Sequence, residues 1–283
     1  EKMQADHLLI VDFGQFAEDI PAVSLGARGI VALEISLTGS KSDLHSGMYG
    51  GIAYNPNRAL AELLAKLWDK DGRIQVPHFY DDVENLSQKA KAIFASPHNR
   101  KDYFNQAGIE AFGGEKGLSL QEVNWFRPTL EINGMVGGYT GSGIKTVIPA
   151  QAHAKITCRL VPNQDPKKIS HNLKEFLIKH AQPGMKIEVT EHGGEEAFRS
   201  NPESKLAQAV AQAASDVTGA ECKYLVSGGS IPIIPALSKA SGAEAIGMGY
   251  GLDSDQIHAP NEHFDMHRFE QGFLTVGRAI GLL

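Results

Sequence analysis

The clearest pattern in the chain is a strict alternation of apolar and polar residues over residues 150–161. Every second residue is apolar: Ala152, Ala154, Ile156, Cys158 and Leu160. A period of two is typical of a β-strand that buries one face. Residues 30–38 alternate in the same way. We therefore predict two half-buried strands, with the apolar face of residues 152–160 packed against helices.

A helical period separates and follows these strands. Residues 56–68 place their leucines on one stripe, and a second stripe begins after Asp165 and Pro166. Asp at the N-cap followed by Pro at the first helical position is a helix-start signal. With further strands predicted at 128–132 and 185–189, the order is strand, helix, strand, strand, helix, strand. That order is typical of a ferredoxin-like α+β domain.

The remaining segments predict a second, larger α/β domain. An apolar strand is predicted near the start of the chain, at His7–Val11, and an alanine-rich helix and a last helix near its end. We assign residues 1–29 and 192–283 to the larger domain and residues 30–191 to the inserted one. The segment 71–127 does not fit the ferredoxin-like order and is interpreted as an insertion. A buried-type strand so early predicts that a further segment precedes it.

Composition narrows the possible partners. The 283 residues carry a net charge of −6, and Lys and Arg form no cluster, so we expect no nucleic-acid partner. No apolar run is long enough to span a bilayer, so we expect no membrane partner. The two cysteines, Cys158 and Cys222, form no CxxC motif, which favours neither a disulfide framework nor a thiolate metal site. A reducing, cytoplasmic setting is the simplest interpretation.

Two residues of the larger domain are candidate metal ligands. Asp12 follows an apolar strand, and ligands of open α/β sheets bind at the carboxyl ends of strands. His258 lies in a loop after the glycine-rich residues 247–251, where a neighbouring acid could orient its second ring nitrogen. The alternatives are a turn-forming aspartate and a solvated loop histidine.

The inserted domain and its flank carry candidates for binding and catalysis. His45 lies among glycines and could donate to a developing oxyanion; alternatively, it is only solvated. Arg159 lies on the polar face of its strand and could grip a carboxylate, or form a surface salt bridge. Ser230 could cap a helix whose amides favour an anion, or act as a cap alone.

Two other acidic or histidine-rich motifs are interpreted as structural. Glu195 and Glu196 resemble a paired-carboxylate site but lie directly after the inserted domain. His263 and Asp265 resemble a metal motif, but Asp265 immediately precedes the last helix and is better explained as its N-cap.

Five strings occur together in one order: DLHSGMYGG, GSGIKTVIP, CRLVPN, GGSIPI and HAPNE. In this order they resemble the M20-type metallopeptidases, especially the branch of carnosine and cytosolic nonspecific dipeptidases, over essentially the whole chain. The resemblance implies an α/β catalytic domain, incomplete here, with an inserted ferredoxin-like lid and dimerisation domain. It also implies a homodimer formed through that lid.

The resemblance also implies residue roles. Asp12 and His258 would each bind one of two divalent metal ions, with zinc expected and manganese or cobalt as alternatives. His45 would reach into the active site of the partner subunit and steady the tetrahedral intermediate. The substrate would be held by three residues: Thr146, Arg159 and Ser230.

The family's remaining metal ligands and its general base are expected upstream of Asp12, and the chain has no counterpart to them. The function implied is hydrolysis of dipeptides by a metal-activated water in the intact protein. Two alternatives stay open: deacylation of N-acyl amino acids, and a dimerisation fragment without catalytic activity.

Overall fold

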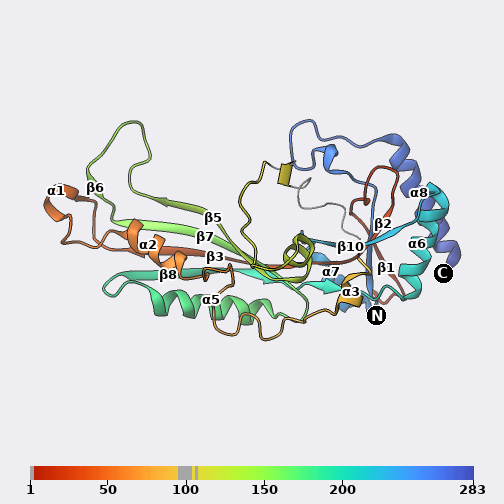
Figure 1. Ribbon diagram of the computed structural model, residues 1–283, viewed down its shortest axis with the longest axis horizontal. Coiled ribbons are helices and arrows are strands. Elements are labelled where there is room, and N and C mark those ends of the chain that lie inside the picture. The colour runs from red at the N-terminus through yellow and green to blue at the C-terminus, as the bar shows by residue number, and fades with distance from the viewer. Residues whose placement is uncertain (1–2, 95–103, 106–107) are drawn as a thin grey trace. The chain divides into compact units, whose positions relative to one another are not determined.

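The computed structural model describes residues 3–94, 104–105 and 108–283, and its chain divides into two compact units. Unit 1 comprises residues 1–28, 84–111 and 197–283, and unit 2 comprises residues 29–83 and 112–196. Figure 1 labels the elements of both units.

Unit 2 is built on a four-stranded antiparallel sheet in the order β5-β7-β3-β8. The strands are β3 (Gly29–Thr38), β5 (Thr129–Gly137), β7 (Gln151–Leu160) and β8 (Lys186–Glu195). The helices are α2 (Pro56–Ala65) and α5 (Pro166–His180), and Figure 1 shows α5 running along the sheet. The predicted order of strands and helices is confirmed.

The face of the sheet that packs on the helices is the one that the alternation predicts. The alternating apolar residues of β7, Ala152 to Leu160, are all buried, and Arg159 is half-buried on the other face. They share one core with α2 and α5, including Leu60 and Leu173. At about 25 cal/mol per Å² of apolar surface removed from water, this core is the main favourable contribution to folding of the unit.

Smaller elements complete unit 2. They are the two-residue strands β4 (Leu44–His45) and β6 (Val147–Ile148), the short helix α1 (Ser46–Tyr49) and the π-helix η1 (Glu122–Phe126). Ser119 and Glu122 form a capping box at the start of η1: the Ser119 N–H donates to Glu122 Oε2 at 2.9 Å, and the Glu122 N–H donates to Ser119 Oγ at 3.2 Å.

The segment 71–127 differs from a simple insertion. Ile74, Val76 and Phe79 are buried in the core of unit 2, whereas residues 84–111 belong to unit 1. The part at 95–103 and 106–107 lies outside the described residues. The inserted domain is predicted to run from residue 30 to residue 191. Unit 2 begins at residue 29 and ends at residue 196, with residues 84–111 assigned to unit 1.

Unit 1 contains a mixed sheet in the order β1-β11-β2-β10, with β9 also paired to β2. Its strands are β1 (Leu8–Val11), β2 (Ala22–Ala27), β9 (Phe198–Arg199), β10 (Lys223–Ser227) and β11 (Ala245–Met248). β2 is buried at every residue, and the apolar pattern alone did not identify it because Ser24 and Gly26 interrupt it.

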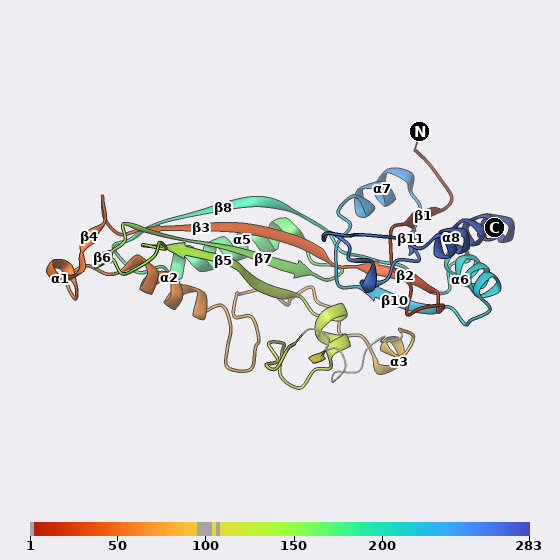
Figure 2. The same cartoon turned by 90° about the horizontal axis from the view of Figure 1, so that it is seen from above.

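Among the described residues, unit 1 has the helices α3 (Gln88–Lys91), α6 (Lys205–Thr218), α7 (Ile233–Ser241) and α8 (Met266–Leu282), with a 3-10 turn η2 (Asp253–Asp255). α6 and α8 pack against each other, as Figure 2 shows. Asp265 is the N-cap of α8 and accepts from the N–H of His267, which confirms the structural interpretation of that residue. No helix in the described part of the chain is long and apolar enough to cross a membrane.

Candidate active site

The first predicted ligand, Asp12, lies where β1 ends beside β11. The two strands are parallel, with Val11 opposite Met248. The chain after Asp12 continues alongside the residues after Met248, because the N–H of Phe13 donates to Met248 O and that of Gln15 to Gly251 O. The Asp12 side chain is exposed at this strand end, the position at which α/β sheets bind ligands.

Glycines make this close approach of two backbones possible. A Cβ on Gly249 would lie 1.8 Å from the carbonyl oxygen of Phe13, and one on Gly247 would lie 2.3 Å from the Phe13 ring. Any side chain at these positions would therefore force the segments apart. The glycine-rich run that the sequence places before His258 is explained by this contact.

The second predicted ligand, His258, lies on an exposed loop that follows this run. Three non-glycine residues of the loop have left-handed backbones: Gln256, His258 and Asn261, with φ of 57°, 63° and 65°. Such residues persist only where surrounding structure holds them, and they gather at functional sites. Asp12 follows β1, and His258 lies in the loop after β11. These two strands are paired in the sheet of unit 1.

These two residues do not complete a metal centre. Throughout residues 3–94, 104–105 and 108–283, no three or more His, Cys, Asp or Glu side chains form a group that could hold a metal ion. A closed zinc site uses four protein ligands, and a catalytic one uses three and a water. The residues described here therefore do not fit a metal centre by themselves.

A buried ion pair that the sequence did not reveal lies next to the His258 loop. Asp255 and Arg268 are 2% and 9% exposed, and the guanidinium contacts both carboxylate oxygens at 2.6 and 2.5 Å. The Arg268 guanidinium lowers the pKa of the Asp255 carboxyl to about 2. The only hint in the sequence is that an acid, Asp255, precedes the loop and a base, Arg268, lies in the first turn of the last helix.

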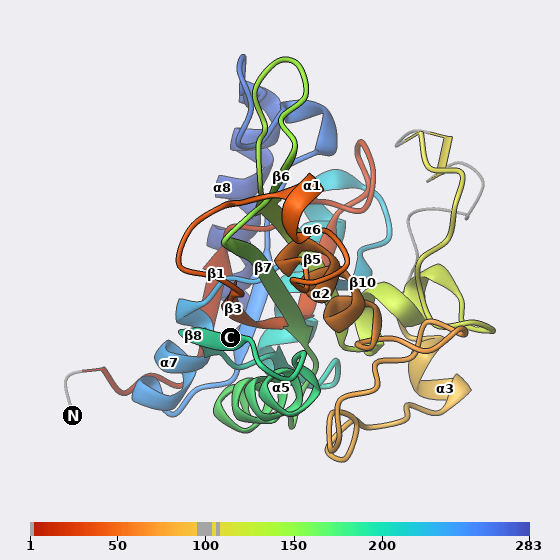
Figure 3. The same ribbon diagram turned by 90° about the vertical axis from the view of Figure 1, so that its left-hand side faces the viewer.

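In unit 2, the structure brings His45 and Thr146 together. β4 pairs with β6, so His45 lies opposite Val147, and the N–H of Ser46 donates to Thr146 O at 3.0 Å. Figure 3 shows α1 beside β6 at this tip. His45 is the N-cap of α1, and its Nδ1 accepts from the N–H of Gly47 at 3.0 Å.

This contact defines which nitrogen of His45 carries a proton. An imidazole nitrogen that accepts from an N–H is unprotonated, so the neutral ring bears its proton on Nε2. The side chain is exposed. His45 therefore presents an N–H donor to its surroundings, as an oxyanion-stabilising role requires.

Arg159 lies near the end of β7 in the four-stranded sheet, whereas His45 lies in the separate two-stranded sheet of β4 and β6. β6 precedes the opposite end of β7, which begins at Gln151. Arg159 pairs with Ile30 at the start of β3 and with Thr129 at the start of β5. From Gln151 to Arg159, β7 advances about 26 Å at the usual rise of a strand. Within one chain the structure therefore does not bring Arg159 together with His45 and Thr146.

Ser230 does not cap a helix, and that prediction is wrong. α7 begins at Ile233 with Pro232 as its N-cap, and no side chain caps it. The Ser230 hydroxyl instead donates to the carbonyl oxygen of Arg28 at 2.5 Å. The Arg28 backbone and side chain in turn donate to the carbonyl oxygens of Gly229 and Gly228. The Gly-Gly-Ser segment is thus held by the end of β2 rather than by a helix.

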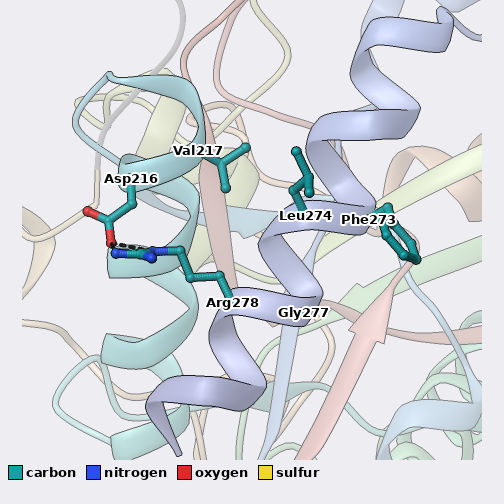
Figure 4. Close-up of a pocket in the computed structure, with 6 residues that line it drawn as sticks. All are labelled: Asp216, Val217, Phe273, Leu274, Gly277 and Arg278. Carbon is teal, nitrogen blue, oxygen red and sulfur yellow. Dashed lines mark hydrogen bonds and ion pairs between the residues drawn. The ribbon is translucent and has the colours of Figure 1, made fainter.

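A separate hollow lies on unit 1 between α6 and α8 and contains none of these residues. Its lining includes Val217 of α6 and Phe273 of α8, together with an ion pair between Asp216 and Arg278 (Figure 4). Because its lining has no histidine and its Asp216 carboxylate is paired with Arg278, we do not regard it as the active site.

Comparison with known proteins identifies the family. The family model described as the peptidase dimerisation domain of the M20 peptidases matches residues 25–185, more than half of the chain. The chain belongs to the M20 peptidase family. The matched region spans β3, α2, β5, β7 and α5 of unit 2 and includes His45, Thr146 and Arg159.

Relatives with curated names are M20 dipeptidases. The chain is 29% identical to the Cys-Gly metallodipeptidase DUG1 of Candida albicans over 97% of its own length and 57% of that protein. It is 27% identical to the human Beta-Ala-His dipeptidase over 94% of its length and 54% of that protein. The chain therefore spans little more than half the length of these M20 relatives.

Solved M20 structures have the same fold. The metallo-carboxypeptidase Sso-CP2 of Sulfolobus solfataricus superposes with a TM-score of 0.88 and 28% identity, covering 99% of this chain and 64% of that one. Human carnosine dipeptidase 1 superposes with a TM-score of 0.77 and 26% identity, covering 98% and 59%.

Proposed function

We propose that the protein hydrolyses dipeptides with the help of two divalent metal ions, zinc being the expected metal. The main support is the similarity to M20 metallodipeptidases, which extends over 97% of the chain in the Candida relative. Asp12 and His258 each contribute to one ion, and they do so together with ligands that the described residues do not include. The metals supply Lewis-acid activation of the scissile carbonyl and of water.

The chain's own contribution is to hold the substrate and to donate to its carbonyl oxygen. Arg159 pairs with the free carboxylate of the dipeptide, since a guanidinium matches a carboxylate with two parallel hydrogen bonds. Thr146 and Ser230 contact the substrate backbone. His45 donates through Nε2–H to the oxygen that becomes negative when the carbonyl is attacked.

The separation of these residues supports a homodimer formed through unit 2. An extended dipeptide spans only about 7 Å, whereas β7 places Arg159 about 26 Å from its own first residue, Gln151. β6, which pairs with the strand of His45, lies directly before that first residue. The two groups of one chain cannot both contact one dipeptide. His45 and Thr146 therefore serve the active site of the partner subunit.

A hydrolysis assay tests this function on the complete protein supplied with zinc, manganese or cobalt. We expect release of free amino acids from Cys-Gly or β-alanyl-histidine, and loss of that activity when a chelator removes the metal. An N-acetyl amino acid serves as the matched substrate for deacylation. Faster cleavage of the N-acetyl substrate would favour the deacylase, and no cleavage of any substrate would favour a dimerisation protein without catalytic activity.

A further inference from the structure

The loop that carries His258 has few interactions of its own. Its residues 256–262 are exposed, and the hydrogen bonds of the loop are local: the N–H of Ala259 donates to Gln256 O at 2.9 Å, and Asn261 O accepts from Nδ1 of His263 at 3.1 Å. Left-handed backbones at Gln256, His258 and Asn261 are unfavourable for residues with a side chain. The loop conformation must therefore be imposed at its two ends.

Both ends of the loop are joined to Asp255 or Arg268, by side-chain contacts before the loop and by a main-chain hydrogen bond and a ring contact after it. Before the loop, Asp255 Oδ2 accepts from the N–H of Leu252 at 2.8 Å, and Arg268 donates to Tyr250 O at 2.8 Å. After the loop, the N–H of His263 donates to Asp255 O at 3.1 Å. The guanidinium also lies 4.8 Å from the centre of the Phe264 ring, within the range of a cation–π contact.

We propose that Asp255 and Arg268 form a positioning pair, which holds the 256–262 loop in the conformation that presents His258. The proposal rests on the proposed function for its meaning in catalysis, since His258 is assigned there to the active site. Neither residue of the pair touches the substrate. Their role is to keep the histidine in place through the loop.

The strongest alternative is that the pair serves only the stability of unit 1. Burial of an ion pair is weak evidence for stability, because replacement of both charges by apolar residues of similar size often leaves stability unchanged or higher. The double variant Asp255→Leu with Arg268→Met separates the two roles. It removes the polar contacts to Leu252 and Tyr250 while it leaves no unpaired charge in the interior.

Hydrogen exchange of single amides measures the loop directly. The amides of Ala259 and His263 report on it because both donate to backbone oxygens, so the substitutions do not remove their acceptors. We expect these two amides to exchange at least tenfold faster in the double variant, while amides of α6 and the melting temperature stay close to those of the original protein. Arg268→Lys, which keeps one charge without the fork, should give an intermediate rate.

The matched control is Arg278→Met on the same helix. Arg278 forms an exposed ion pair with Asp216, so its loss removes a charge pair of α8 that does not touch the loop. Loop exchange should stay unchanged in this variant. Unchanged exchange at Ala259 and His263 in the double variant would overturn the proposal, as would an equal increase throughout α6 and α8. A failure of the proposed function is detected by a different measurement. If His258→Ala hydrolyses dipeptides as fast as the original protein, His258 does not serve the active site, whatever the exchange rates of the loop.

Discussion

His45 and Gly47 are joined by a hydrogen bond from the Gly47 N–H to Nδ1 of the His45 ring, at 3.0 Å. Glycine permits this contact, since a Cβ at position 47 would lie 3.0 Å from Cε1 and 3.2 Å from Nδ1 of that ring. The bond keeps the proton of the neutral imidazole on Nε2.

The first prediction follows from this crowding. Gly47→Ala should displace the His45 ring and lower turnover on the order of tenfold, because small misplacements of catalytic groups are costly. His45→Ala should lower turnover by about two to three orders of magnitude, as expected for loss of an oxyanion donor. Nitrogen-15 NMR of the ring measures the tautomer, and Ser46→Ala is the neighbouring control. If Gly47→Ala leaves both the tautomer of the His45 ring and the turnover unchanged, this contact does not position His45.

The second prediction concerns recognition of the substrate carboxylate. Arg159→Lys should lower kcat/KM by roughly ten- to a hundredfold for dipeptides, since an ammonium cannot form two parallel hydrogen bonds. The loss should shrink for the same dipeptides with an amidated C-terminus. Steady-state kinetics on both substrate types measures the difference, and equal losses would make Arg159 a structural residue.

The third prediction concerns assembly. Because His45 and Arg159 of one chain cannot contact one dipeptide, the protein should be a dimer with twice the 30.5 kDa mass of the chain. Light scattering over a range of concentrations measures this mass. In the complete protein supplied with metal, mixing His45→Ala subunits with Arg159→Ala subunits should restore part of the activity, because one of the two mixed sites is intact. A monomer at high concentration, or no recovery on mixing, would contradict the shared site.

The fourth prediction is a dependence of stability on pH. The Arg268 guanidinium holds the pKa of Asp255 at about 2 in the folded protein, against about 3.9 for an unfolded chain. The carboxylate therefore stabilises the fold fully above about pH 4, and this contribution is lost as the pH falls toward 2. Melting temperatures between pH 5 and pH 2 should fall more steeply for the original protein than for Asp255→Asn. Parallel curves would show that another carboxylate dominates the acid response.

The fifth prediction concerns metal binding by the chain of 283 residues itself. Two ligands are too few for a zinc site, so calorimetric titration with zinc should reveal no tight stoichiometric binding, and dipeptides should not be hydrolysed. Tight binding and normal turnover would overturn the assignment and bring Glu195, Glu196, His263 and Asp265 back as candidate ligands.

Much of unit 2 follows from the sequence because its signals are local. The alternation around Ile156 predicts the buried face of β7, and Asp165 before Pro166 predicts the start of α5. The face of a strand or the stripe of a helix that is buried on folding must be apolar. Apolar residues therefore recur with the period of the element, and the period identifies it. The family also follows from short strings, since five of them occur together in one order, and the family model that matches residues 25–185 confirms the membership.

Other features were decided only by contacts between residues far apart in the chain. Ser230 donates to Arg28, which lies 202 positions away, and neither residue type indicates this partner in advance. β2 escapes the pattern for two reasons: burial of both faces removes the alternation, and Ser24 and Gly26 interrupt the continuous apolar run that a fully buried strand would otherwise show. Asp255 and Arg268 are ordinary surface residue types until the fold buries them together. Sequence thus determined the elements whose burial repeats with a fixed period, and tertiary structure decided which polar groups meet, because a buried hydrogen-bonding group takes whichever partner the packing brings within reach.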